Sequence, residues 1–120
     1  MYSPDVPDKI LVWMGTSLED LRDFPLDAKR IAGYELRRVQ SGLMPTDWKT
    51  MADVGLGVSE IRIHTETEHR VLYVAKFEEA VYVLHAFEKK SRRTREQDLA
   101  LARERLRQVK IFRRPGKEMK

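Results

Sequence analysis

The amino-acid sequence predicts an α+β domain in which helices pack on an antiparallel sheet. Three consecutive strand-like runs, at residues 60–64, 71–77 and 81–87, are separated by short gaps that suit hairpin connections. One amphipathic helical stripe precedes these runs and another follows them. The chain has 120 residues, which suits a single domain with one core, and its hydrophobic content of 42% supports a folded globule.

The first part of the chain is predicted to hold one strand and two helices. Residues 9–14 form a short apolar run that ends at Gly15, and Ser17 with an acid three residues later resembles a capping box that begins a helix. Pro25 ends this helix, because the residue before a proline avoids the helical region. The apolar positions of the second helix recur at spacings of three and four: Ala28, Ala32, Leu36, Val39 and Leu43. Gly42 is suited to its C-cap.

A loop and then the meander follow. Residues 44–57 carry prolines and glycines typical of turns, and we expect Trp48 and Met51 to anchor this loop. The first strand of the meander alternates between an apolar face, Ile61 and Ile63, and a polar face, Glu60, Arg62 and His64. The second and third strands are apolar on both faces, which is typical of buried strands. The N-terminal helices are expected to form a hairpin against this sheet.

The C-terminal quarter is strongly basic. Residues 89–120 carry 13 Lys and Arg against 4 Asp and Glu, a net charge of +9, whereas residues 1–88 carry 10 against 15, a net charge of −5. A helix is expected over residues 95–109, with Leu99, Ala102, Leu106 and Val109 on its apolar face and Arg103, Arg105, Arg107 and Lys110 on other faces. A basic segment on a mildly acidic body favours a polyanion or an acidic protein as partner.

The composition also indicates where the protein is located and which kinds of metal or disulfide site it lacks. The chain contains no cysteine, which excludes disulfides and thiolate zinc sites, and the three histidines show no metal-ligand spacing. No apolar run approaches the roughly 20 residues of a membrane helix, and the N-terminus lacks the apolar region of a signal peptide. We therefore expect a cytoplasmic protein with no membrane partner. Residues 1–120 are expected to form one domain, with residues 1–8 and 113–120 flexible.

Four segments occur in an order that resembles a known family. They are residues 58–62 (VSEIR), residues 69–73 (HRVLY), residues 81–90 (VYVLHAFEKK) and a helix that contains Ala100 and Ala102. Together they resemble the RelE/ParE superfamily of bacterial toxins, and within it the phage-related HigB-like branch of type II toxin–antitoxin systems. The resemblance extends over about residues 10–107.

The resemblance implies a small sheet cupped by helices, with an RNA site in its concave face. It implies a metal-independent endoribonuclease (an mRNA interferase) that cleaves mRNA on the translating ribosome, without a small-molecule cofactor, and so inhibits translation. It also implies an antitoxin partner, in this branch usually a helix-turn-helix protein encoded beside the toxin. The arginines of the family map onto Arg70 and Arg62, and its basic pair after the last strand maps onto Lys89 and Lys90. Many relatives carry a C-terminal catalytic Tyr or His, whereas none follows His85 here.

These residue types suit RNA cleavage without metal. A base takes the proton of the 2′-hydroxyl, cations stabilise the phosphorane, and an acid protonates the leaving 5′-oxygen. Arg70 and Arg62 suit the second task, because a guanidinium fork matches two phosphate oxygens. The candidates for acid and base are Lys89 and Lys90, since crowded cations favour a neutral amine, and His85, His64 and His69, since imidazole titrates near neutrality. Further RNA contacts are expected from Arg92, Arg93, Arg95 and His64.

Other interpretations remain open at this point. Arg70 can instead pair with Glu60 or Glu66 across a hairpin, and His85 can be a hydrogen-bonded core residue. The ParE branch of the superfamily implies a poison of DNA gyrase without nuclease activity. A non-catalytic nucleic-acid-binding module, acting through the basic C-terminal helix, is the third function that the sequence allows.

Overall fold

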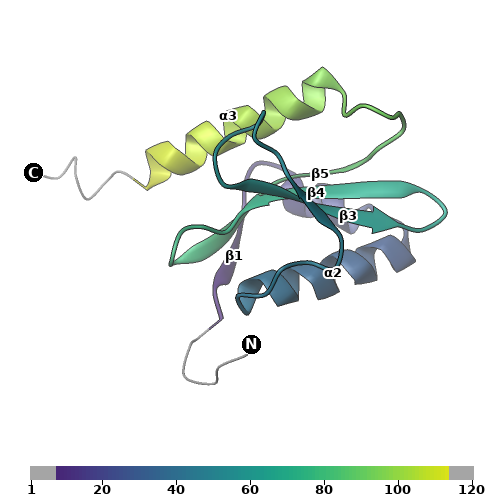
Figure 1. The fold of residues 1–120 in the computed structure, drawn as a ribbon, viewed down its shortest axis with the longest axis horizontal. Helices are drawn as coiled ribbons and strands as arrows, with labels where there is room; N and C mark the ends of the chain where they lie inside the picture. Colours follow the sequence, from purple (N-terminus) through teal and green to yellow (C-terminus); the bar gives the residue numbers. More distant parts are fainter. Residues whose placement is uncertain (1–7, 114–120) are drawn as a thin grey trace, which may run out of the picture.

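The computed structural model describes residues 8–113, which form a five-stranded sheet with helices on both of its faces (Figure 1). The elements in chain order are β1 (Ile10–Trp13), α1 (Ser17–Arg22), α2 (Leu26–Gln40), β2 (Trp48–Thr50), β3 (Val58–His64), β4 (Glu68–Val74), β5 (Ala80–Glu88) and α3 (Glu96–Phe112). This architecture confirms the α+β class, and each helix and strand expected from the sequence is present.

The sheet has the strand order β1-β5-β4-β3-β2. Strands β3, β4 and β5 are antiparallel neighbours, as the meander predicted. Strand β1, however, runs parallel to β5, with Leu11 opposite Val81. The expectation of an antiparallel sheet is therefore wrong at this edge. A short apolar run predicts a strand, but it does not indicate which strand pairs with it or in which direction.

The segment expected as a loop contains the short edge strand β2. Trp48 lies opposite Ile61 and Thr50 lies opposite Ser59 in an antiparallel register with β3. Met51 is buried and anchors the segment as expected, but Trp48 is 39% exposed and does not. Each of the three residues of β2 is exposed, so the strand forms through pairing with β3 and leaves no hydrophobic pattern in the sequence.

The boundaries of β4 differ most from the prediction. The strand begins at Glu68, three residues earlier than expected, and ends at Val74. Its polar start includes Arg70, which the hydrophobic pattern had left outside the strand. The turn to β3 is closed by a hydrogen bond from the Thr65 N–H to the Thr67 carbonyl (3.0 Å). The early start places Arg70 on a rigid strand.

Both faces of the sheet are covered. Helices α1 and α2 lie on one face and α3 lies on the other (Figure 1). The first core packs Leu21, Phe24, Ala28, Ala32, Leu36 and Val39 against the strands. In the second core, Ala102, Leu106 and Val109 of α3 pack on the opposite face. Strands β4 and β5 are consequently buried on both faces, which explains their apolar composition. The arrangement is consistent with a RelE-like fold.

The C-terminal end of α2 matches the prediction, whereas the N-terminal end of α1 does not. Gly42 has φ +87° and its N–H donates to Val39, while the Leu43 N–H donates to Arg38, so α2 ends in a Schellman motif as expected. Helix α1 instead has Thr16 as its N-cap residue, and the capping box at Ser17 is wrong. Ser17 is buried, and its hydroxyl donates to the carbonyl of Val83 on β5 (3.2 Å).

Arg105 departs from the expected outward orientation of the α3 cations. It is only 9% exposed, and its guanidinium donates to the carbonyl of Leu84 (2.9 Å) and to the hydroxyl of Thr16 (3.1 Å). These bonds tie α3 to β5 and to the start of α1. The helical periodicity alone could not reveal this, because a long arginine can reach across an apolar face to a carbonyl.

The predicted flexible ends, residues 1–8 and 113–120, fall mostly outside the described residues. Within residues 8–113, Asp8 forms an ion pair with Arg37 (2.9 Å), and Arg113 forms hydrogen bonds with Glu79. None of the helices in this described part combines the length and the hydrophobicity that crossing a membrane requires.

Gly15→Ala is expected to destabilise the fold by at least about 1 kcal/mol, because the left-handed region is unfavourable for alanine. Gly15 has φ +55°, and an added Cβ would lie 2.5 Å from Nε of Arg105, displacing the side chain that ties α3 to β5. Gly33→Ala is the matched control. It lies in the interior of α2 with open space around it, and it is expected to stabilise by roughly 0.5–1 kcal/mol. Urea unfolding of the two variants measures both effects, and equal behaviour of the two would contradict this account of Gly15.

Candidate functional site

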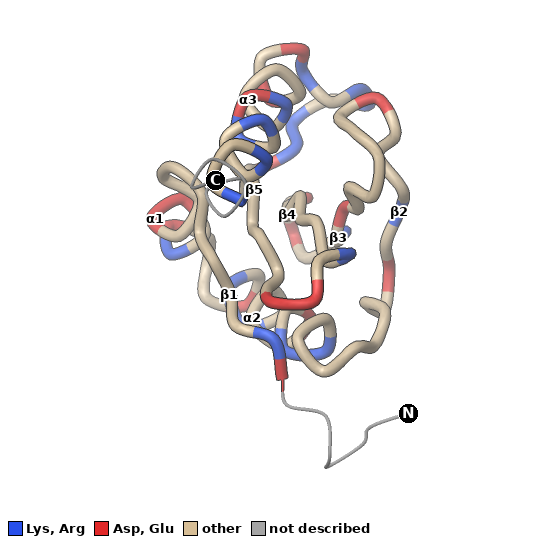
Figure 2. The backbone as a smooth tube through the Cα atoms, turned by 90° about the vertical axis from the view of Figure 1, so that its left-hand side faces the viewer, with Lys and Arg blue, Asp and Glu red and all other residues tan. Residues whose placement is uncertain are grey.

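Six cationic side chains of the described residues surround a cavity of about 310 Å³ on the face of the sheet that α3 covers. They are Lys49 of β2, Arg62 of β3, Arg70 of β4, and Lys89, Arg92 and Arg93 of the segment between β5 and α3. Figure 2 marks the Lys and Arg positions of β2 and of this segment in blue. The rest of the lining is Thr50, Met51, Asp53, Glu60, Thr94 and Leu99. We call this cavity the cationic hollow.

Strand parity and register place Arg62 and Arg70 side by side. Ile61 and Ile63 turn toward the core under α2, so Glu60 and Arg62 face the hollow, as their alternation predicted. In the ladder between β3 and β4, Arg62 lies directly opposite Arg70. Like charges directly opposite each other destabilise a sheet, so this pair requires a compensating anion.

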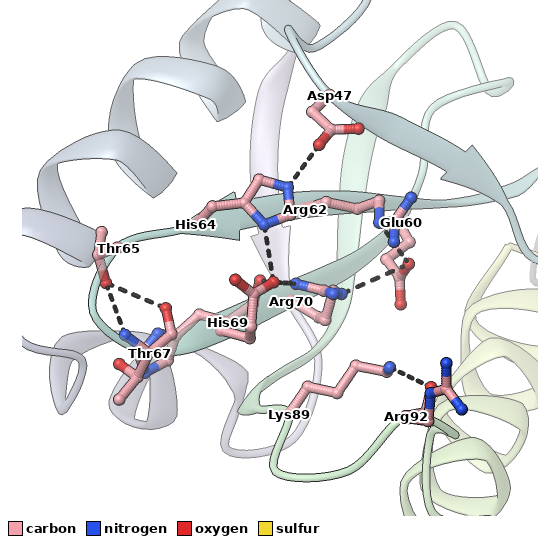
Figure 3. A network of polar contacts seen from close by, with 11 residues as sticks. Asp47, Glu60, Arg62, His64, Thr65, Thr67, His69, Arg70, Lys89 and Arg92 are labelled. Carbon is pink, nitrogen blue, oxygen red and sulfur yellow. Dashed lines mark hydrogen bonds and ion pairs between the residues drawn. The ribbon is translucent and has the colours of Figure 1, made fainter.

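Glu60 supplies that anion. It is 3% exposed, and its Oε1 lies 3.7 Å from Nε of Arg70 and 4.0 Å from Nε of Arg62 (Figure 3). Both distances are longer than a hydrogen bond. Both Nε atoms are buried, and neither finds a hydrogen-bond acceptor among residues 8–113. The floor of the hollow therefore holds two unused N–H donors beside a carboxylate.

A chain of polar contacts braces Arg70 from outside the hollow (Figure 3). The NH1 atom of Arg70 donates to Glu68 Oε1 and to the main-chain carbonyl of His69, both at 3.0 Å. The same Glu68 oxygen lies 2.7 Å from Nδ1 of His64, whose other ring nitrogen contacts Asp47. Burial acts to raise the pKa of Glu68, but the hydrogen bonds with Arg70 and His64 outweigh it and lower that pKa. His64 belongs to this brace and does not line the hollow.

Lys89 closes the hollow on the side of α3. Its backbone N–H donates to the carbonyl of Glu68 (2.7 Å), which extends the ladder between β4 and β5 beyond the end of β5. Its Nζ donates to the carbonyl of Arg92, and the hydroxyl of Ser91 donates to the carbonyl of Arg93 (2.7 Å). These bonds shape the segment that carries Arg92 and Arg93, whose side chains are exposed at the rim of the hollow.

Two groups in the hollow have pKa values displaced toward neutrality. Burial raises the pKa of Glu60, and this effect outweighs the lowering by the four cations Arg70, Arg62, Lys49 and Lys89. Burial, followed by the charge of Arg70, lowers the pKa of Lys89. The hollow therefore combines two guanidiniums with a carboxyl group whose pKa is raised and an amine whose pKa is lowered.

His85 and Arg95 belong to a separate cluster at the start of α3. Nε2 of His85 lies 2.8 Å from Asp98 Oδ1, and Nε of Arg95 donates to Asp98 Oδ2 (3.0 Å). Burial lowers the pKa of His85. Both residues line a different depression of about 500 Å³. Lys90 is exposed and lines neither of these two cavities.

The residues singled out in the sequence thus divide into two groups. The hollow brings together Arg62, Arg70, Lys89, Arg92 and Arg93, whereas Lys90, His85, His64 and Arg95 lie outside it. Two charged members of the hollow beside the arginines, Glu60 and Lys49, are not predicted as site residues from the sequence. Glu60 carries a usable signal, because it shares the strand face of Arg62, but the sequence pattern alone indicates no more than an ion-pair partner of Arg70. Lys49 carries no such signal in the sequence, because the strand β2 that positions it leaves no hydrophobic pattern.

A comparison with protein families gives one match. The family described as phage-derived protein Gp49-like (DUF891) matches residues 19–107, about three quarters of the chain. The matched region includes β2 to β5, most of α3 and every residue that lines the cationic hollow. No curated protein matches the chain.

Glu60→Gln is expected to remove the contribution that ionisation of Glu60 makes to the pH dependence of the free energy of unfolding. Because the folded state raises the pKa of Glu60, it binds this proton more tightly than the unfolded chain does. The free energy of unfolding of the wild-type protein should therefore fall, relative to the variant, as the pH rises from about 4.5 through the folded-state pKa. Urea unfolding of both proteins across this range measures the difference. Glu78→Gln, in an exposed turn, is the control and should follow the wild type. A difference that does not change with pH would contradict the raised pKa.

Proposed function

Because the chain belongs to the phage-derived Gp49-like family, a family of RelE/HigB-like toxins, we propose that it is a HigB-like toxin of a type II toxin–antitoxin system that cleaves mRNA on the ribosome. The observation that carries this proposal is the convergence of Arg62 and Arg70, directly opposite each other on β3 and β4, on the cationic hollow. Lys89 beside them adds a third cationic group. Such an arrangement suits a phosphodiester better than it suits a neutral ligand.

The cations of the hollow suit the stabilisation of charge in metal-independent cleavage. Attack of the 2′-oxygen on phosphorus builds negative charge on the non-bridging oxygens of the phosphorane. Arg62 and Arg70 can donate to these oxygens from fixed positions on adjacent strands, so little reorganisation is needed as the charge develops. Arg92 and Arg93 lie at the rim, where they suit the phosphates of flanking nucleotides. The products would be a 2′,3′-cyclic phosphate and a 5′-hydroxyl.

The proposal includes an antitoxin and a cytoplasmic site of action. Membership of a toxin family implies an antitoxin partner, and we propose a helix-turn-helix protein encoded beside this chain. An acidic segment of that protein would neutralise the hollow by covering its cations. Residues 1–120 would act as one domain, in the compartment that contains the translating ribosomes.

The α3 helix offers a poorer nucleic-acid site than the hollow. A binding surface on this helix would need its arginines to face solvent, but Arg105 is buried and bonded to Leu84. Arg107 is exposed, but Glu104 accepts two hydrogen bonds from it. The cations of the hollow converge, whereas those of α3 are distributed around the helix.

Arg70→Ala is expected to lower mRNA cleavage on ribosomes by roughly 100-fold or more, because one preorganised donor to the phosphorane is lost. Arg62→Ala should behave similarly, and Arg70→Lys should also be impaired because it keeps the charge and loses the fork. Arg107→Ala is the matched control outside the hollow, and its cleavage should stay within about twofold of wild type. Primer extension on mRNA from ribosomes programmed in vitro measures all four.

Three outcomes would contradict the proposal. Intact mRNA with the wild-type protein would remove the nuclease activity. DNA damage and filamentation, with translation unaffected, would indicate a gyrase poison. A larger defect for Arg107→Ala than for Arg70→Ala, together with binding that weakens steeply with salt, would indicate a non-catalytic nucleic-acid-binding module acting through α3.

A further inference from the structure

Glu60 occupies an unusual position for a structural ion-pair partner. Its carboxylate is buried at the floor of the cationic hollow, 3.7 Å and 4.0 Å from the Nε atoms of Arg70 and Arg62. A carboxylate whose function is to hold an arginine normally accepts hydrogen bonds of 2.7–2.9 Å from it, as is typical of charge-assisted pairs. Here Arg70 bonds instead to Glu68 and to the backbone of His69. Glu60 therefore stands beside the two arginines without immobilising either.

No imidazole among the described residues lines the hollow. His64 lies between two carboxylates outside it, and His85 pairs with Asp98 near the start of α3. His69 packs on the ring of Phe24, with ring centroids 4.3 Å apart, on the opposite face of the sheet. The proton acceptor for a reaction in the hollow must therefore be sought among its carboxylates and amines.

Two carboxylates of residues 8–113 line the hollow, and only one of them lies near the arginines that would hold phosphate. Asp53 is exposed in the loop after β2. Oε1 of Glu60 lies within 4.0 Å of the Nε atoms of both arginines, so a phosphate held by the two guanidiniums would lie, with its adjoining ribose, beside this carboxylate.

We propose that Glu60 is the general base of the cleavage reaction and Lys89 its general acid, an assignment that rests on the ribonuclease function proposed above. The carboxylate of Glu60 takes the proton of the 2′-hydroxyl while the 2′-oxygen forms a bond to phosphorus. The bond from phosphorus to the 5′-oxygen breaks, and the ammonium of Lys89 gives its proton to that oxygen. Glu60 then returns its proton to solvent and Lys89 regains one, so both residues are restored.

The charges around Glu60 suit this role. Lys49 from β2, Arg62 from β3, Arg70 from β4 and Lys89 from the segment after β5 face it, with Arg92 and Arg93 at the rim. Burial raises the pKa of the Glu60 carboxyl above its ordinary value, and the charges of these cations oppose that effect. The negative charge of a bound phosphodiester would offset the cations and make the carboxylate more basic when the substrate is in place.

The experiment separates chemistry from binding. Single-turnover cleavage is measured on programmed ribosomes, and affinity is measured on the same complexes with mRNA that carries a 2′-deoxynucleotide at the scissile position. Glu60→Gln keeps the shape of the side chain, and we expect its cleavage rate to fall by about 10²–10⁴-fold, as for loss of a general base. Its affinity for the deoxy mRNA should rise about threefold or more, because a repulsive charge beside the phosphate is removed. Glu78→Gln is the matched control and should resemble wild type in both measurements.

Two further measurements, a pH–rate profile and cleavage of a substrate with a bridging sulfur, distinguish the base from the acid. The wild-type rate should rise with pH on its acidic limb as Glu60 ionises, and Glu60→Gln should lack that limb, whereas Glu60→Asp should retain it with a reduced rate. A substrate with sulfur in place of the bridging 5′-oxygen needs no acid, because the thiolate is a better leaving group. This substrate should restore cleavage by Lys89→Ala and should leave Glu60→Gln inactive.

The results that overturn the inference differ from those that overturn the function. If wild type cleaves and Glu60→Gln cleaves within about tenfold of it, Glu60 is not the base. A variant that loses affinity as much as rate would show that Glu60 only maintains the shape of the hollow. If wild-type protein leaves mRNA intact, the ribonuclease function itself fails, and the role of Glu60 fails with it.

Discussion

The cross-strand contact between Arg62 and Arg70 is the constraint on which the rest of the site depends. Two guanidiniums directly opposite each other on adjacent strands repel one another, and this repulsion grows as the surroundings become less polar. Glu60 offsets it from the same strand face, two residues before Arg62. The three residues therefore form a unit, and none of them can be interpreted alone.

Residues outside the hollow determine where its remaining cations lie. The segment that carries Lys89, Arg92 and Arg93 leaves β5 and enters α3, so its course depends on how α3 is attached to the sheet. Asp98 binds His85 of β5 through one oxygen and Arg95 through the other. Arg105 makes a second attachment, through the carbonyl of Leu84. His85 and Arg95 thus contribute to the hollow by holding its third wall in place, although neither side chain lines it.

The part of this architecture that the sequence predicted is the part with a local pattern. The alternation along β3 predicts that Arg62 lies on the other face of the sheet from Ile61 and Ile63, and the amphipathic stripes predict α2 and α3. The parallel pairing of β1, the strand that carries Lys49 and the burial of Arg105 depend on contacts between segments far apart in the chain. His85 illustrates the limit of resemblance. A motif can match a residue by position, but only the fold decides which cavity that residue faces.

The cations of the hollow suit both of the anions that the proposed function involves. The cations of the hollow attract either anion, whether it is the phosphate of an mRNA or a carboxylate of a protein. An acidic antitoxin segment would therefore compete with RNA for the same two arginines. Because Glu60 disfavours both occupants by its charge, selectivity between them must come from the rim, where Arg92 and Arg93 meet either a nucleic-acid backbone or a protein surface.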